Sequence, residues 1–238
     1  MNPYFAEFLG TAILVIFGNG VVANVVLSRT KGNGAGWIVI SAGWGMAVFV
    51  AVMCVGHYTG AHINPAVTVA MVAAGKLPMN KMLGYIAVQM LGGIVGGMLV
   101  WLFYKDHFNV TDDPNAKLAC FCTAPAIRNI PVAFVCETIG TFLLVLPIFL
   151  SQPAGVGLGA IGALPVGLLV FAIGMSLGGT TGYAINPARD LGPRIAHALV
   201  PIPGKRDPDW AYAWVPVVAP ILGGLLAAGA AKCLVPAV

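Results

Sequence analysis

Charged residues are scarce in this sequence. Only 8% of its 238 residues are Asp, Glu, Lys or Arg, whereas an ordinary soluble domain carries about 25%. So few charges cannot cover a surface that is exposed to water. The formal net charge of +4 is also scattered, without a run of Lys or Arg, which argues against a nucleic-acid-binding surface. We therefore expect a protein that lies in a lipid bilayer and has no nucleic-acid partner.

Clusters of metal-binding residues are missing as well. The five cysteines are odd in number, and three of them lie in apolar stretches, where a thiol packs as a small hydrophobic group. Cys120 and Cys122 have no second Cys or His pair at zinc-binding spacing. The sequence therefore predicts unpaired thiols, with no metal site and no cofactor.

Apolar residues, by contrast, make up 59% of the chain and give it a mean hydropathy of +0.91. They form six runs of about 18 to 24 residues, each long enough to cross a hydrocarbon core of about 30 Å as a helix. The predicted spanning helices are Tyr4–Leu27, Trp37–Val55, Met82–Tyr104, Pro131–Leu150, Ala160–Leu177 and Tyr212–Leu234. The polar connections Lys105–Ile130 and Ser151–Gly157 are predicted to be loops.

Two further apolar segments, Asn64–Ala74 and Asn186–Leu199, hold only 11 and 14 residues. As helices they would reach about 16 to 21 Å, which is too short to cross a bilayer. Backbone at membrane depth is tolerated in broken form only where it is buried in protein or lines a wet cavity. We therefore expect two re-entrant half-helices around a site.

An internal repeat relates the two halves of the chain. GAHINPA at 60–66 matches GYAINPA at 182–188 in five of seven positions, and AEFLGT at 6–11 matches CETIGT at 136–141. Each half holds three predicted spans, an odd number, so the second half must enter the membrane inverted relative to the first. We expect an all-α membrane protein. The repeats are predicted at about 1–108 and about 130–238, within a single channel domain over 1–238.

The repeated signature predicts both half-helices and their chemistry. Asn64 and Asn186 suit the N-cap position, and Pro65 and Pro187 suit the first helical position. A capping Asn can still offer amide N–H donors to a solute, and each helix N-terminus contributes roughly half a positive charge. Two such ends facing one constriction repel cations, whereas a neutral hydroxyl can exchange its hydrogen bonds there. The signatures therefore predict a pore for neutral solutes.

Over its whole length the chain resembles the aquaporin superfamily, or major intrinsic protein family, and within it the aquaglyceroporin or glycerol facilitator branch. The resemblance lies in Asn64-Pro65-Ala66 and Asn186-Pro187-Ala188, in the matched pair Glu7 and Glu137, and in the sequence NPARD at 186–190. It implies a homotetramer with one pore per subunit, placed in the cell membrane as a multi-pass protein with both termini in the cytoplasm.

The resemblance also implies a selectivity filter of four residues, Trp44, Gly174, Tyr183 and Arg189. Arg189 would offer a fixed fork of donors to hydroxyl groups and a permanent positive charge against cations and hydronium. Its alternative role is a structural ion pair. Trp44 and Tyr183 would form an apolar corner for the carbon edge of a polyol. Gly174 stands where water-selective relatives carry a bulky His, and the free space would admit the carbon backbone of glycerol.

Glu7 and Glu137 are carboxylates inside predicted spans, and such groups are functional candidates in a membrane. They could couple protons to transport. The resemblance instead implies that they accept hydrogen bonds from the re-entrant loops, together with His62, and their occurrence as a matched pair favours this supporting role.

Asp190, Arg194 and Pro216 match the glycerol branch of the family. Asp190 and Arg194 also stand four residues apart, the spacing of an ion pair on a helix, with the acid near the helix N-terminus where it is stabilised. We expect these three residues to mark the subtype rather than to line the pore.

The leading hypothesis is passive conduction of glycerol, water and related small uncharged solutes, with exclusion of ions and protons. The alternatives are a water-preferring aquaporin and a proton-coupled solute transporter, because inverted repeats and broken helices also build transporters. An enzyme is not expected, because no paired nucleophile and base converge at the signatures. The implied orientation places three Lys inside and seven Lys or Arg outside, against the positive-inside tendency.

Overall fold

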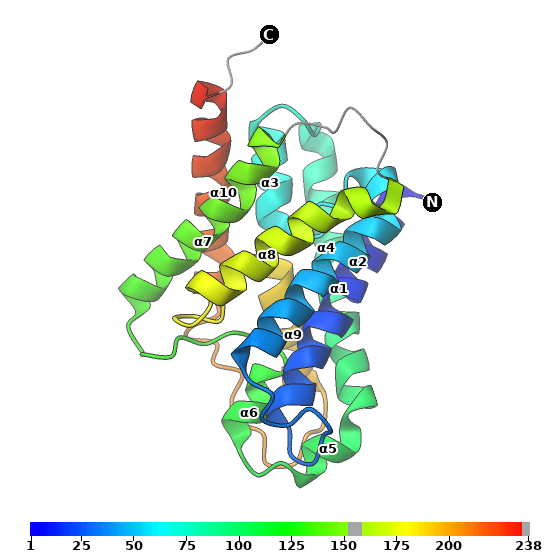
Figure 1. The fold of residues 1–238 in the computed structure, drawn as a ribbon, viewed down its shortest axis with the longest axis vertical. Helices are drawn as coiled ribbons and strands as arrows, with labels where there is room; N and C mark the ends of the chain where they lie inside the picture. The colour runs from blue at the N-terminus through cyan, green and yellow to red at the C-terminus, as the bar shows by residue number, and fades with distance from the viewer. Residues whose placement is uncertain (152–158, 235–238) are drawn as a thin grey trace.

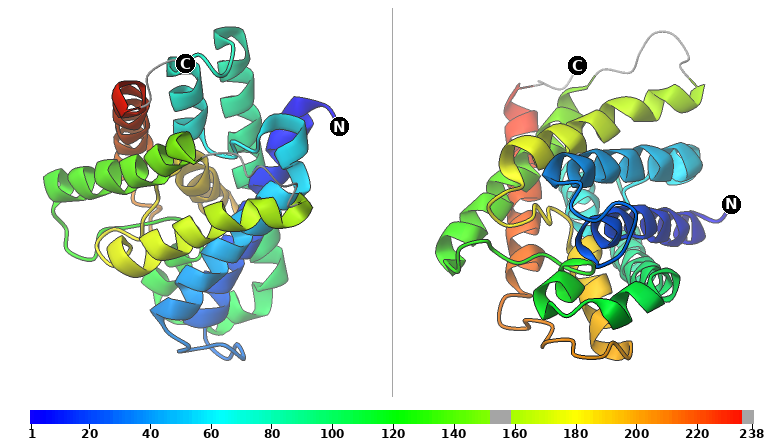
Figure 2. Two further views of the ribbon diagram at one scale, coloured as in Figure 1. Left: turned by 45° about the horizontal axis from the view of Figure 1, so that its top comes forward. Right: turned by 60° about the horizontal axis from the view of Figure 1, so that its bottom comes forward.

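The computed structural model describes residues 1–151 and 159–234 of the chain. Every regular element in these ranges is a helix, and they contain no β-strand, so the all-α prediction is confirmed. Of the predicted loop Ser151–Gly157, all but Ser151 lies outside the described residues. Figure 1 and, from two further directions, Figure 2 show the helices packed together as one body.

Six helices correspond to the predicted spans. They are α1 Pro3–Val26, α2 Trp37–Thr59, α4 Met79–Phe103, α7 Ile130–Leu150, α8 Leu164–Leu177 and α10 Val215–Leu234. Five of them are long and apolar enough to cross a membrane, counting only the described residues. The exception is α8, which has 14 residues and follows the 3-10 turn η1, Gly159–Ala163. Pro165 lies in the first turn of α8, where its missing N–H group leaves no hydrogen bond unmade. A helix that began at Ala160 would place this proline beyond its first turn, and the α-helix begins four residues later than predicted.

Two short helices, α3 Pro65–Ala73 and α9 Pro187–Leu199, stand where the half-helices are predicted. Each begins directly after an Asn whose side-chain oxygen caps it. Asn64 Oδ1 accepts a hydrogen bond from the backbone N–H of Ala66 at 2.9 Å, and Asn186 Oδ1 accepts one from that of Ala188 at 3.0 Å. The signature residues therefore act locally as the N-cap rule predicts.

The two halves of the chain pack across one another. In the first half α1 packs against α2 and α4, and in the second half α7 packs against α10. The short helix α3 packs on α10, and α9 packs on α4, so each short helix lies on a long helix of the opposite half. The space between the short helices is consequently enclosed by both halves of the chain.

The connection Lys105–Ile130 is more ordered than the predicted loop. It contains two short helices, α5 Lys105–Val110 and α6 Pro114–Ala119. Asp113 accepts a hydrogen bond from the backbone N–H of Asn115 at 2.8 Å and so caps α6. Phe108 and Phe121 are fully buried in one apolar cluster with the end of α1. The loop prediction was wrong for these residues because the polar composition of the segment obscured its few apolar anchors.

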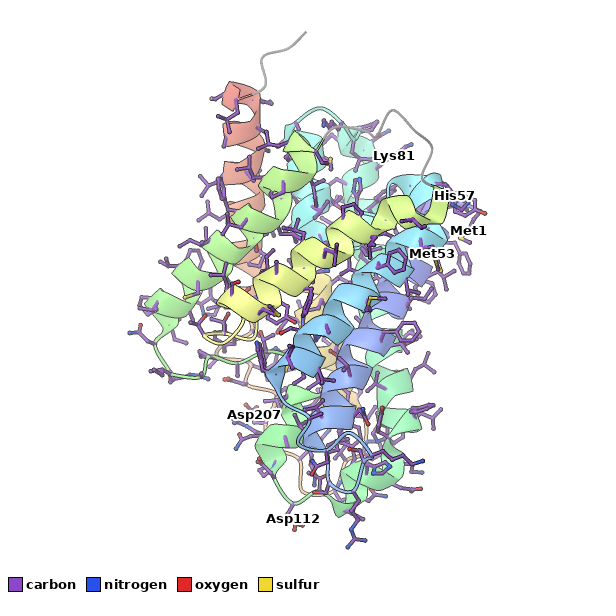
Figure 3. All side chains as sticks on the ribbon, viewed as in Figure 1. Met1, Met53, His57, Lys81, Asp112 and Asp207 are labelled. Atoms are coloured by element: carbon purple, nitrogen blue, oxygen red, sulfur yellow. The ribbon has the colours of Figure 1, made fainter. Side chains whose placement is uncertain are left out.

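The outer surface is apolar along the long helices and polar at the two ends of the bundle. Leu83 is 73% exposed and Phe103 is 82% exposed, as suits a surface that faces lipid rather than water. Figure 3 shows Asp112 and Asp207 toward one end of the molecule and His57 and Lys81 toward the other. This distribution agrees with a bundle that spans a membrane.

Glycines permit close approach where the helices cross. A Cβ atom at Gly92 would lie 2.4 Å from a backbone oxygen of α1, and one at Gly93 would lie 2.4 Å from a backbone oxygen of α9. In the second half, a Cβ atom at Gly223 would lie 2.3 Å from a backbone oxygen of α7. Because the opposing atoms belong to the backbone, they could not move aside without shifting a helix.

We predict that Gly93→Ala lowers the free energy of unfolding by about 1 to 3 kcal/mol, the usual cost of overpacking, because α9 would be pushed away from α4. Thermal unfolding of the purified protein in detergent micelles measures this loss. Gly20→Ala is the matched control on α1, where an added Cβ atom would meet no described atom within 4 Å. Equal melting temperatures for the two variants would contradict the prediction.

Candidate functional site

The two short helices meet at their N-termini through a reciprocal pair of hydrogen bonds. Asn64 Nδ2 donates to the carbonyl oxygen of Ile185 at 2.8 Å, and Asn186 Nδ2 donates to that of Ile63 at 2.8 Å. Each Asn side chain therefore caps its own helix with its oxygen and holds the loop of the other half with its nitrogen. One of the two amide N–H groups is used in this way, which leaves the second for a solute.

The loops that precede these helices are strained in the same way in both halves. Ala61 and Ile63 have φ angles of 50° and 42°, and Tyr183 and Ile185 have φ angles of 39° and 44°. Positive φ is a real outlier for a β-branched residue such as Ile. Such strain persists only where the surroundings hold the backbone in place, so the loops need anchors.

The matched glutamates are those anchors. Glu7 accepts hydrogen bonds from the backbone N–H groups of His62 at 2.9 Å and Ile63 at 2.7 Å. Glu137 accepts them from Ala184 at 2.9 Å and Ile185 at 2.8 Å. Both glutamates are buried. Each carboxylate thus uses both oxygens to hold one loop.

Gln89 on α4 adds a further support to the loop of the first half. Its Nε2 atom donates to Glu7 Oε2 at 2.8 Å and to Thr68 Oγ1 at 2.9 Å. The same hydroxyl lies 3.1 Å from Nδ1 of His62, so His62 also belongs to this network. Sequence reasoning did not select Gln89, because a lone Gln in an apolar run carries no pattern that points to a buried network.

A cavity of about 630 Å³ lies between the half-helices and is lined by residues of both halves. Its walls are mainly aliphatic, and the polar side chains that line it include Asn64, Asn186, His62, Ser151 and Arg189. Neither Glu7 nor Glu137 is among the lining residues. The cavity therefore presents amide and cationic groups, while the buried carboxylates stay behind the loops.

Three of the four predicted filter residues, Trp44, Tyr183 and Arg189, line this cavity together. The Arg189 guanidinium lies over the ring of Trp44, 3.9 Å from its centroid, a favourable cation–π arrangement. Arg189 is 6% exposed. It takes part in neither of the two ion pairs found within the described residues, so the alternative of a structural ion pair has no support there.

Gly174 acts less directly than the sequence suggested. It is not among the residues that line the cavity. A Cβ atom at Gly174 would lie 2.8 Å from the hydroxyl oxygen of Tyr183 and 3.1 Å from Cβ of Ser41. The space that its missing side chain leaves is occupied by the Tyr183 phenol rather than open to a solute. Gly174 therefore decides where the Tyr183 side chain, which lines the cavity, can lie.

Asp190 and Arg194 form a fully buried ion pair, with Arg194 Nη2 2.7 Å from Asp190 Oδ1. Asp190 Oδ2 also accepts from the backbone N–H and the hydroxyl of Thr123, both at 2.7 Å. Arg194 donates to the carbonyl oxygens of Thr123 at 2.9 Å and of Asp209 at 3.2 Å. The sequence predicted that these two residues mark a subtype, and in the structure the pair ties α9 to two connections of the chain. Pro216, the third predicted marker, is buried in the first turn of α10.

Asp209, whose carbonyl oxygen accepts a hydrogen bond from Arg194, is held in turn by an ion pair between its carboxylate and Arg128. The hydrogen bonds from the Arg128 guanidinium hold the pKa of the Asp209 carboxyl below its ordinary value. No group of three or more His, Cys, Asp or Glu side chains suited to a metal ion occurs in the described ranges. The five cysteines are free thiols.

Comparisons with known proteins agree with this geometry. The family model for the major intrinsic protein family matches residues 1–230. The chain is 54% identical over 234 residues to a probable glycerol uptake facilitator protein of Thermotoga maritima, covering 96% of this chain and 97% of that protein. It is 52% identical over 231 residues to a glycerol uptake facilitator protein of Streptococcus pneumoniae, covering 95% of this chain and 97% of that protein.

Among solved structures, the aquaglyceroporin from Plasmodium falciparum matches with a TM-score of 0.86 and 31% sequence identity. The match covers 98% of this chain and 96% of that chain. The protein belongs to the major intrinsic protein family, a class of multi-pass membrane proteins. The resemblance drawn from the signatures is therefore confirmed over nearly the whole chain.

We predict that Glu137→Gln destabilises the protein by about 1.5 to 3 kcal/mol, the range for a hydrogen bond to a charged group. The Gln amide would place an NH2 group, a donor, where one of the two carboxylate oxygens now accepts from Ala184 or Ile185. Thermal unfolding in detergent micelles measures the loss. Asp112→Asn, which removes an exposed carboxylate, is the control. If the two variants unfold at the same temperature, Glu137 does not anchor the loop.

Proposed function

We propose that the protein is a passive transmembrane channel that conducts glycerol, water and related small uncharged solutes and excludes ions and protons. One observation carries the proposal. Two half-helices from opposite halves of the chain meet N-terminus to N-terminus at a cavity that the Arg189 side chain also lines. The names of the relatives, glycerol uptake facilitators at 54% and 52% identity, support glycerol as the principal solute.

Exclusion of ions follows from the signs of the charges at the cavity. Each half-helix contributes roughly half a positive charge at its N-terminus, and Arg189 adds a full one. The anchoring carboxylates do not line the cavity, so a cation meets no compensating negative charge there. An anion would be attracted, but stripping its water in a narrow apolar bore costs tens of kcal/mol by Born solvation. A neutral alcohol or water molecule instead exchanges its hydrogen bonds with the amide and guanidinium donors.

Selection of glycerol rests on the shape and chemistry of the filter. Trp44 and Tyr183 line the cavity, and their aromatic side chains suit the carbon edge of a polyol. Arg189 lies over the Trp44 ring and offers N–H donors to the hydroxyl edge. An amphipathic solute can thus satisfy both walls at once. A filter built for water alone would need no apolar corner.

Proton-coupled transport is the weaker alternative. A proton relay needs titratable groups that face the solute path. Both oxygens of Glu7 and of Glu137 accept hydrogen bonds from the strained loops, and protonating either carboxylate would release its loop. The carboxylates therefore support the pore rather than carry protons.

We further propose that residues 1–238 form one channel domain, with repeats at about 1–108 and about 130–238. It would assemble as a homotetramer in the cell membrane with both termini in the cytoplasm. Protease treatment of right-side-out and inside-out vesicles tests this orientation at the connection Lys105–Ile130. Cleavage only from the cytoplasmic face would overturn it.

The decisive experiment is stopped-flow light scattering on proteoliposomes, with gradients of water, glycerol and urea imposed with and without a pH gradient. We expect glycerol flux well above that of empty liposomes and no dependence on the proton gradient. Absence of glycerol flux would overturn the glycerol assignment in favour of a water-preferring channel. Flux that requires protons would overturn the channel in favour of a transporter.

We predict that Gly174→His lowers glycerol permeability by about tenfold or more, the scale of steric discrimination in a tight pocket, and lowers water permeability much less. The new side chain would begin 2.8 Å from the Tyr183 hydroxyl and would displace the Tyr183 ring toward the solute path. The same stopped-flow assay measures both permeabilities. Equal losses for glycerol and water would contradict the place given to Gly174 in the filter.

A further inference from the structure

One face of α2 contacts the filter at three successive positions. Trp37, Ser41 and Trp44 stand at i, i+4 and i+7, the spacing of residues on one side of a helix. Trp44 lies under the Arg189 guanidinium. The other two residues, which neither the signatures nor the resemblance selects, lie against Tyr183 and the end of α8.

Trp37 makes two specific contacts at this place. Its indole Nε1 donates a hydrogen bond to the carbonyl oxygen of Gly174 at 2.9 Å. Its ring meets the ring of Tyr183 edge to face, with centroids 5.9 Å apart and an interplanar angle of 79°, a favourable aromatic geometry. One side chain thus connects α2, the glycine of α8 and the aromatic wall of the filter.

The surface at the end of α8 that faces Trp37 and Tyr183 consists of glycines without side chains, so both aromatic rings can pack against it. A Cβ atom at Gly178 would lie 2.4 Å from Cδ1 of Tyr183 and 2.7 Å from Cζ2 of Trp37. Gly174, one turn earlier, would meet the Tyr183 hydroxyl in the same way. The Tyr183 ring is therefore bounded by two glycines on one side and by α2 on the other.

Ser41 completes the boundary at the hydroxyl end of the ring. It is fully buried, and its Cβ atom and the Tyr183 hydroxyl oxygen both lie within 3.1 Å of the position that a Gly174 Cβ would take. Neither hydroxyl has a hydrogen-bond partner among the described residues. Each hydroxyl can act as a donor and as an acceptor, so the two groups are chemically suited to pair with each other.

A Trp at the end of a spanning helix often serves only as an anchor at the membrane surface. An anchor of that kind directs its N–H group toward water or lipid headgroups. The Trp37 N–H group is instead bonded inside the protein, to a backbone oxygen next to the filter. Its ring also contacts a filter residue rather than lipid alone, so a role in the filter explains more of its contacts.

We infer that Trp37 and Ser41 are positioning residues, which hold the Tyr183 ring at a fixed distance from Trp44 and so set the width of the filter. Neither residue contacts the solute. They act through Tyr183, and the inference therefore rests on the proposed channel function. Loss of either contact allows the Tyr183 ring to move, so the channel distinguishes solutes of different width less sharply.

The test compares Trp37→Phe, which keeps an aromatic ring but removes the N–H group, with the wild-type protein in proteoliposomes. The readout is the ratio of glycerol permeability to that of erythritol, a polyol one carbon longer. We expect this ratio to fall by about fivefold, the factor that corresponds to one neutral hydrogen bond. Water permeability should stay within about twofold, which a general loss of structure would not allow.

Trp210→Phe is the matched control, because Trp210 is 46% exposed and Trp37 is 41% exposed, and it should keep the wild-type ratio. Ser41→Ala is a second variant with a smaller change, and it should lower the ratio in the same direction. An unchanged ratio in Trp37→Phe overturns the inference. If Trp37→Phe does not fold, an unchanged permeability ratio in Ser41→Ala is sufficient to overturn the inference.

Failure of the proposed function would be seen separately, as wild-type vesicles that pass no glycerol. In that case the contact itself is tested by hydrogen exchange of the indole N–H groups, followed by nuclear magnetic resonance in detergent micelles. The Trp37 N–H should exchange more slowly than that of Trp210, because it is bonded to Gly174. Equal or faster exchange of the Trp37 signal would overturn the inference without reference to transport.

Discussion

The backbone N–H groups of the two strained loops must be satisfied inside the protein, and the rest of the site depends on how this is done. The loop N–H groups that point away from the cavity are buried in protein at membrane depth, where an unpaired N–H group is costly. Glu7 and Glu137 each accept two loop N–H groups at 2.7 to 2.9 Å. They thereby hold Ile63 and Ile185 at positive φ, in positions where the Asn of the opposite half can reach their carbonyl oxygens.

This use of the carboxylates also sets the electrostatics of the cavity. Because both glutamates face the loops, the negative charge that the fold requires is kept away from the solute path. Arg189 is the one Lys, Arg, Asp or Glu among the described residues that line the cavity. The buried pair of Asp190 and Arg194 fixes the start of α9 to its neighbouring connections. Anchoring and ion rejection thus follow from one arrangement of charge.

Absent side chains shape the site as much as present ones. Gly93 lets α9 approach α4 so closely that the backbones of the two helices are in contact. Gly174 and Gly178 carry no side chain, so the ring of Tyr183 can pack against the end of α8. Trp37 then closes this space from α2 through a hydrogen bond to Gly174. The Tyr183 side of the cavity is therefore formed by the end of α8 and the loop that follows it, together with α2, whose Trp37 is 137 positions from Gly174 in the sequence.

The sequence by itself determined the membrane setting, the long and short helices and the repeat, because hydropathy, helix length and the Asn-Pro caps are local properties. The matched glutamates could also be recognised in the sequence, because the repeat places one of them at the same position in each half. Only the tertiary structure decided what lies beside Gly174, which side chain supports Glu7 from α4, and that Lys105–Ile130 holds two short helices anchored by a few buried residues. Those features depend on contacts between distant segments. No local sequence pattern indicates which residues Gln89, Ser41 and Trp37 contact.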